Sequence, residues 1–150
     1  MTSTTIKDIG DLIVVKVQAI QVGGKDIFGS VLGYADGDMK KYPAVRITPK
    51  GGRGEVIDTH RNQRTFNFEI ALYQEQSVAG EDKAGAAALM TQAADAILEA
   101  FDHDNDLGGE VEIVRVVEFD TDFKVASGTF NFATFRIDCV VNVPNYSVSP

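Results

Sequence analysis

Residues 64–74 constrain the fold of this chain more than any other segment. Large apolar side chains occupy every second position, namely Phe66, Phe68, Ile70 and Leu72. The positions between them are polar or small, namely Thr65, Asn67, Glu69 and Ala71. A period of two places one set of side chains against a core and the other set on the opposite face. The segment therefore predicts a half-buried antiparallel strand.

Shorter apolar stretches predict further strands on both sides of this one. Residues 27–35 and 44–48 are apolar and are separated by the turn signal Asp36-Gly37-Asp38. A later strand is predicted from the alternation of Glu112 and Glu118 with Val111, Ile113, Val117 and Phe119.

The last predicted strand changes phase along its length. Phe130 and Phe132 share one phase. The opposite phase holds Phe135, Ile137, Cys139, Val141 and Val143. One extra residue in a strand would bring both sets onto the same face of the sheet, so we expect a β-bulge near Ala133 and Thr134.

Two segments show apolar residues at helical spacing. The first contains Ile6, Ile9, Ile13, Val17 and Ile20. Thr5, with Asp8 three positions later, is placed to cap it, and we expect it to end at Gly23 and Gly24. Because residues 13–17 are mostly β-branched, a strand is the alternative. The second helix is predicted over residues 84–101, with Asp82 as its cap, from Ala86, Leu89, Ala93, Ile97, Ala100 and Phe101.

This order of elements predicts an α+β fold. We expect a mostly antiparallel mixed sheet of about five strands with two helices packed on one face, as a single domain over residues 1–150. Residues 1–5 and 143–150 are rich in Ser, Thr, Asn and Pro and are expected to be short flexible ends. The uncovered face is expected to carry Val114, Val116 and Val140 beside Glu69, Arg136 and Asp138. Such a face is more apolar than a fully solvated surface, so we expect part of it to meet another subunit.

The charge balance argues against a general affinity for nucleic acid. The chain has 14 basic and 22 acidic residues, a formal net charge of −8, and such binding needs cations that displace counterions from phosphates. Residues 50–64 are locally basic, but their glycines indicate a solvated loop. The apolar run at residues 12–15 is too short to span a membrane, and residues 1–5 lack the basic start of a signal peptide. We therefore expect a soluble, non-exported protein.

One acidic cluster favours a metal site only in part. Asp102, Asp104 and Asp106 stand at the first, third and fifth positions of a calcium loop. Leu107 replaces the glycine of the sixth position, and Ile113 replaces the glutamate of the twelfth. The pattern therefore favours a polar helix-to-strand turn, and a small calcium- or ligand-binding module is the alternative.

Catalytic patterns are missing from the sequence. His60 and His103 have no cysteine near them that could complete a zinc site, and Cys139 lies in an apolar strand pattern typical of a buried thiol. No nucleophile turn of the Gly-x-Ser-x-Gly type and no phosphate loop is present. We expect neither an enzyme nor a bound cofactor or metal.

The order of pieces resembles a known family. The matching parts are the N-terminal helix, the strand around residues 42–47, the β excursion that ends in residues 64–70, the helix over 84–101, the turn at 106–109 and two closing strands. Together they are similar to the tail terminator, or tail completion, proteins of long-tailed bacteriophages.

The resemblance implies a structural role in the virion, with assembly in the host cytoplasm. Subunits of this family form a ring, commonly a hexamer, that caps the head-proximal end of the tail tube, stops its polymerisation and joins it to the head connector or neck. The implied partners are therefore copies of the chain itself, the tail tube protein and the connector. DNA would pass through the lumen without specific binding, and no membrane is involved.

Candidate assembly contacts follow from the same picture. We expect residues 50–64 and 121–128 to project from the sheet and to touch neighbouring rings, through Lys50, Arg53, Arg61, Arg64, Thr121 and Lys124. A head-completion or neck subunit and a tail tube subunit remain the alternatives within assembly proteins.

Overall fold

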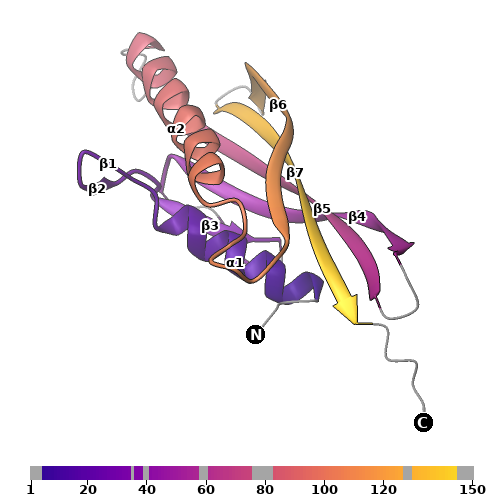
Figure 1. Cartoon of the computed structure of the whole chain (residues 1–150). Coiled ribbons are helices and arrows are strands. Elements are labelled where there is room, and N and C mark those ends of the chain that lie inside the picture. Colours follow the sequence, from indigo (N-terminus) through magenta and orange to yellow (C-terminus); the bar gives the residue numbers. More distant parts are fainter. Residues whose placement is uncertain are drawn as a thin grey trace.

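The computed structural model describes residues 5–34, 36–38, 41–57, 61–75, 83–126 and 130–144. Within these ranges the chain forms two helices, a two-stranded sheet and a five-stranded sheet (Figure 1). The elements are α1 (Ile6–Gln18), β1 (Gln21–Val22), β2 (Lys25–Asp26), β3 (Ser30–Gly33), β4 (Ala44–Val56), β5 (Arg61–Glu75), α2 (Lys83–His103), β6 (Ile113–Ala126) and β7 (Phe130–Pro144). The expected α+β class is confirmed.

Helix α1 forms where helical spacing and strand propensity compete. The Thr5 hydroxyl accepts a hydrogen bond from the Asp8 amide at 3.1 Å, which satisfies one of the free N–H groups at the helix start. One stripe of the helix is fully buried, namely Ile9, Ile13 and Val17. Burial of this stripe outweighs β-branching, so the helical interpretation is confirmed.

We expected α1 to end at Gly23 and Gly24, and this prediction is wrong. The helix ends at Gln18, and both glycines have positive φ, +61° and +78°, in the turn between β1 and β2. Glycine adopts this conformation without strain, and a hairpin of two-residue strands needs it at its turn.

The large sheet has the strand order β3-β4-β5-β7-β6. β3 pairs with β4 in parallel, and every other pair is antiparallel. The strand expected over residues 27–35 is shorter than predicted, because only Ser30 to Gly33 pair with β4. The other strand expected near it, over residues 44–48, is the first part of a much longer β4.

The loop expected over residues 50–64 is largely strand, and this corrects the prediction. A bulge lies between Pro49 and Gly52, after which β4 pairs with β5 as far as Val56 opposite Asn62. Backbone pairing requires no apolar alternation, so glycines and charged residues are compatible with it. We call residues 50–56 of β4, the following Ile57 and residues 61–64 of β5 the arm. Residues 58–60, including His60, lie outside the described part.

The predicted bulge in β7 is wrong. β7 pairs with β5 without interruption from Phe130 opposite Glu75 to Pro144 opposite Arg61. The bulges of this region lie in β6 instead, between Val116 and Glu118 and between Asp120 and Lys124. The two phases of β7 therefore face opposite sides of the sheet. Because β7 continues through Val143 and Pro144, these residues are not part of a flexible end, while residues 1–4 and 145–150 lie outside the described part.

Before its bulge, strand β6 has the opposite phase from the one predicted, whereas beyond the bulge Glu118 and Phe119 keep the predicted phase. Val114 is fully buried opposite Cys139, and Val116 is partly buried against the core opposite Ile137, whereas Ile113 lies on the other face. Val117 is the bulged residue and is 41% exposed. Apolar residues in both phases made the periodicity ambiguous, and the bulge reverses it halfway along the strand.

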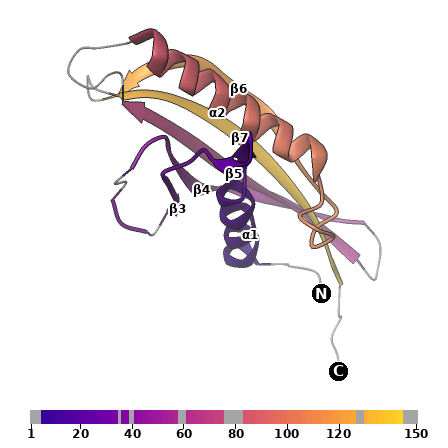
Figure 2. The same ribbon diagram turned by 90° about the vertical axis from the view of Figure 1, so that its left-hand side faces the viewer.

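Both helices cover the same face of the sheet, which we call the helix face (Figure 2). α1 contacts β3 and β4, and α2 contacts β5 and β6. The core lies between the layers, and its largest fully buried side chains include Phe68, Phe101, Phe135, Ile9, Ile97 and Met90. Leu89, predicted on the buried stripe of α2, is 46% exposed, and Met90 is buried instead. The proposed cap Asp82 lies outside the described residues.

Candidate functional site

The arm is the part of the sheet that the helices leave bare. All seven residues of β4 from position 50 to 56 are exposed, although Gly52 to Val56 pair with β5. Figures 1 and 2 show β4 and β5 continuing beyond the helix layer. An ordinary strand of a two-layer fold buries at least one face, so the arm is a surface available to a partner.

The end of the arm is apolar. Val56 is 71% exposed and Ile57 is 42% exposed. This pair was not predicted from the sequence. The signal that could have revealed it is two adjacent aliphatic residues directly after a run of glycines and charged residues. Exposed aliphatic side chains at the end of a projecting hairpin are typical of an interaction site.

The six predicted contact residues fall into two groups, one on the arm and one on β6. Lys50, Arg53 and Arg64 are exposed on the arm, and Arg61 begins β5 opposite Pro144. Thr121 lies in the irregular stretch of β6, and Lys124 pairs with Phe132. Lys124 and Arg61 are level with Phe132 and Pro144, which are twelve positions apart along β7, a span of about 40 Å. Lys50 and Thr121 are nearer to each other, because their neighbours Pro49 and Asp120 align with Ile137 and Thr134 of β7. Only Arg61 and Lys124 therefore lie at opposite ends of the sheet.

The face of the sheet opposite the helices, which we call the open face, is more polar than expected. Across its middle run Glu69 of β5, Arg136 of β7 and Glu118 of β6, and Arg136 and Glu118 form an exposed ion pair at 3.7 Å. Val140 lies on this face, but Val114 and Val116 do not. The apolar contact expected here loses two of its three valines, so the open face is a weaker candidate interface than the arm.

A groove runs between α1 and the β3–β4 edge of the sheet. Its volume is about 680 Å³, and its lining is mainly apolar, namely Ile6, Val14, Val15, Tyr34, Pro49 and Phe68. Three of these side chains are large, apolar and well exposed: Ile6 at 47%, Val15 at 61% and Tyr34 at 64%. We call this hollow the α1–β3 groove. The sequence did not reveal it, because four segments distant in sequence form it.

Arg46 fixes one wall of the α1–β3 groove. Its guanidinium donates hydrogen bonds to the carbonyl oxygens of Gly33 at 3.0 Å, Asp36 at 3.1 Å and Gly37 at 2.7 Å. The Asp36 carboxylate in turn accepts from the Gly33 amide at 2.7 Å. The planar fork of an arginine suits several acceptors at once, so the segment after β3 is held in place before any partner arrives.

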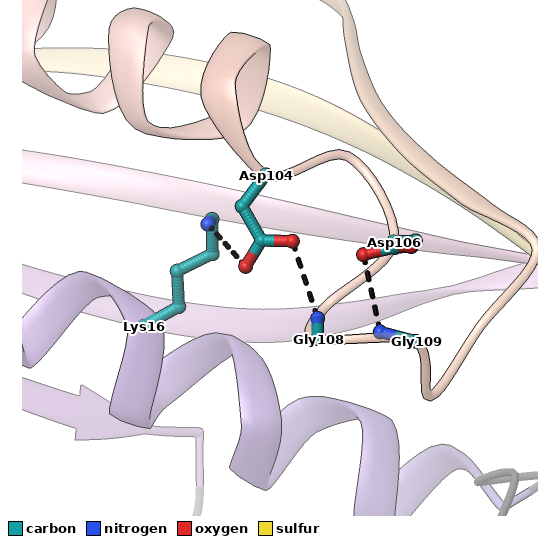
Figure 3. Close-up of polar contacts among 5 residues, drawn as sticks. All are labelled: Lys16, Asp104, Asp106, Gly108 and Gly109. Carbon is teal, nitrogen blue, oxygen red and sulfur yellow. Dashed lines mark hydrogen bonds and ion pairs between the residues drawn. The ribbon is translucent and has the colours of Figure 1, made fainter.

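The acidic turn after α2 uses its carboxylates for structure (Figure 3). Asp104 accepts a hydrogen bond from Lys16 Nζ at 3.0 Å and another from the Gly108 amide at 3.2 Å. Asp106 accepts from the Gly109 amide at 3.1 Å. The bond from Lys16 joins α1 to the end of α2, and the other two hold the turn. Lys16 Nζ also lies 5.4 Å from the centre of the Phe101 ring. The hydrogen bond from Lys16 lowers the pKa of Asp104 to about 2.

Asp104→Asn should lower the free energy of unfolding at pH 7 by less than about 1 kcal/mol, because the Asp104 side chain is 42% exposed and water screens the pair. An aspartate with a lowered pKa stabilises the fold above its ordinary pKa of 3.8 and loses that contribution as the pH falls toward about 2. The difference between wild type and variant should therefore shrink from pH 4 to pH 2 in denaturant unfolding. Asp102→Asn, an exposed residue of the same region, is the control. A difference that widened in acid would contradict this role.

The remaining candidates for chemistry have structural surroundings. Cys139 is fully buried, and burial raises the pKa of its thiol to about 12, so the expected buried thiol is confirmed. His103 lies 3.3 Å from Glu99 on the exposed side of α2. Within the described ranges no three His, Cys, Asp or Glu side chains are grouped so that they could hold a metal ion.

The described helices include none that is both long enough and apolar enough to cross a bilayer.

No protein-family model matches the sequence, and no curated protein matches it.

Proposed function

We propose that this chain is the subunit of a phage tail terminator ring, which caps the head-proximal end of the tail tube, stops tube growth and joins the tail to the head connector. The ring is a homo-oligomer, commonly a hexamer in the family that the sequence resembles. The protein works by shape and contact, as a component of the virion.

The bare arm is the observation that carries this proposal. A run of seven exposed strand residues ends at the exposed Val56 and is followed by the exposed Ile57, and a projecting hairpin of this kind gains little from its own fold. Burial against another molecule would stabilise it. The resemblance in element order makes copies of the same chain the first candidates for that molecule.

Ring closure follows when two different surfaces of one subunit meet head to tail. Each copy then contributes one surface to each neighbour, and a rotation that closes leaves two ring faces free. Arg61 and Lys124 lie about 40 Å apart along β7. In the proposed ring these two residues serve the two faces, one toward the tube and the other toward the connector.

The charge of the subunit suits a channel that DNA must traverse. A net charge of −8 repels phosphate, so the proposed ring does not retain the passing DNA.

A capping experiment tests the proposed function. The tail tube protein of the same virus is allowed to polymerise with and without this protein, and tube lengths are measured by electron microscopy. The proposal predicts shorter tubes that carry a ring at one end as the concentration of the protein rises. An unchanged length distribution, with no protein bound at tube ends, would contradict it.

A further inference from the structure

The exposed apolar side chains are concentrated on two surfaces. Among the described residues nine large apolar side chains are well exposed. Five of the nine lie either at the end of the arm or in the α1–β3 groove, namely Val56, Ile57, Ile6, Val15 and Tyr34. A projection and a hollow of similar chemistry on one molecule are the two halves of a head-to-tail contact.

One subunit cannot make this contact with itself. Figure 2 shows β3 on one side of α1 and the arm extending away on the other side. The groove lies between α1 and β3, so the end of the arm points away from it. The arm can therefore fill only the groove of another copy.

The charges of the two surfaces are complementary. The exposed arm carries three cations, Lys50, Arg53 and Arg64, and one carboxylate, Glu55. Around the groove and on the first turn of α1, three carboxylates, Asp8, Asp11 and Asp36, outnumber two cations. The cations are Lys7, which pairs with Asp11 at 2.8 Å, and Arg46 in the groove wall. Opposite charge at the rim orients two surfaces before their apolar parts meet.

The groove is already shaped to receive such a segment. Arg46 holds the segment that carries Tyr34, and α1 supplies the opposite wall through Ile6 and Val15. A volume of about 680 Å³ lies within the range of sites that bind apolar groups. A preformed wall reduces the ordering cost of binding.

We infer that the end of the arm, Val56 and Ile57, inserts into the α1–β3 groove of a second copy of this chain, and that this contact repeats around the ring. The inference rests on the proposed ring function and assigns its subunit interface. It also gives Arg46 the role of a positioning residue, because it acts through the wall that it holds.

Cysteine cross-linking tests the inference directly. The double variant Val56→Cys/Tyr34→Cys should form intermolecular disulfides under mild oxidation, in a ladder of covalent oligomers that ends at the size of the ring. The control Val56→Cys/Val117→Cys has its second thiol on β6, at a residue 41% exposed. It should give at least ten-fold less cross-linked product. The native Cys139 is fully buried and does not compete. A mixture of the two single variants, Val56→Cys and Tyr34→Cys, should give covalent dimers only.

A charge placed at the end of the arm provides a second, independent test. Val56→Asp should abolish rings while the subunit stays folded, because Val56 is 71% exposed, and Val117→Asp should leave them intact. Rings that form without cross-linking above the control, or that survive Val56→Asp, would overturn this interface and leave the ring function standing. A wild-type protein that forms no ring, together with a Val56→Cys/Tyr34→Cys variant that forms no cross-link, would overturn both.

Discussion

Phe135→Ala should lower the free energy of unfolding by about 3–5 kcal/mol. Phe135 is fully buried on the helix face, opposite Ile70 of β5 and Phe119 of β6. Removing its ring exchanges buried apolar contacts for a cavity between the sheet and α2, which the surrounding strands cannot close. Denaturant unfolding followed by circular dichroism measures the loss.

Phe119→Ala is the matched control for this substitution. The two rings stack with their centres 6.4 Å apart, but Phe119 is 52% exposed at the edge of the sheet. Its truncation should cost about 0.5–1.5 kcal/mol, the value of an aromatic pair. Equal losses for the two variants would mean that Phe135 does not lie in the core.

Gly52→Ala should disrupt the arm and with it the proposed ring. Gly52 resumes the pairing of β4 with β5 after the bulge, opposite Phe66. A Cβ atom at this position would collide with the carbonyl oxygen of Thr65 and would lie 3.2 Å from the Phe66 Cα, so the backbone must shift. The expected cost is about 1–3 kcal/mol of stability, together with a shift of the oligomer toward single subunits in size-exclusion chromatography with light scattering.

Gly54→Ala provides the comparison, because a Cβ atom there meets nothing within 4 Å. This variant should keep both the stability and the oligomeric state of the wild type. If Gly52→Ala assembled as well as Gly54→Ala, the arm geometry would have no part in association.

The elements that the sequence predicted well are those with one covered face. β5 alternates through Phe66, Phe68, Ile70 and Leu72, of which the last three are buried, and α1 presents its buried stripe at helical spacing. In both cases burial on one side imposes a period that single residues reveal. Cys139 follows the same rule within β7.

The arm could not be read from the sequence because it has no covered face. Its strand in β4 carries three glycines and three charges, a composition equally suited to a solvated loop. Long-range backbone pairing decides between the two, and composition does not encode it. The phase of β6 was ambiguous for a related reason, since the bulge at Val117 shifts the pattern within one strand.

The candidate interface was predictable only in part. Lys50, Arg53 and Arg64 lie on the arm, as part of the segment expected to make contacts. The α1–β3 groove depends on the approach of Ile6 and Tyr34, which tertiary packing brings together. The acidic turn was ambiguous for calcium until the hydrogen bonds of Asp104 and Asp106 were located.

Negative-stain electron microscopy of the purified wild-type protein is the most direct measurement of whether copies of this chain close into a ring. Uniform rings of a single diameter, dissolved by Val56→Asp, are the predicted result. Isolated subunits at high protein concentration, both alone and beside tail tubes, or long cylinders without discrete rings, would contradict it.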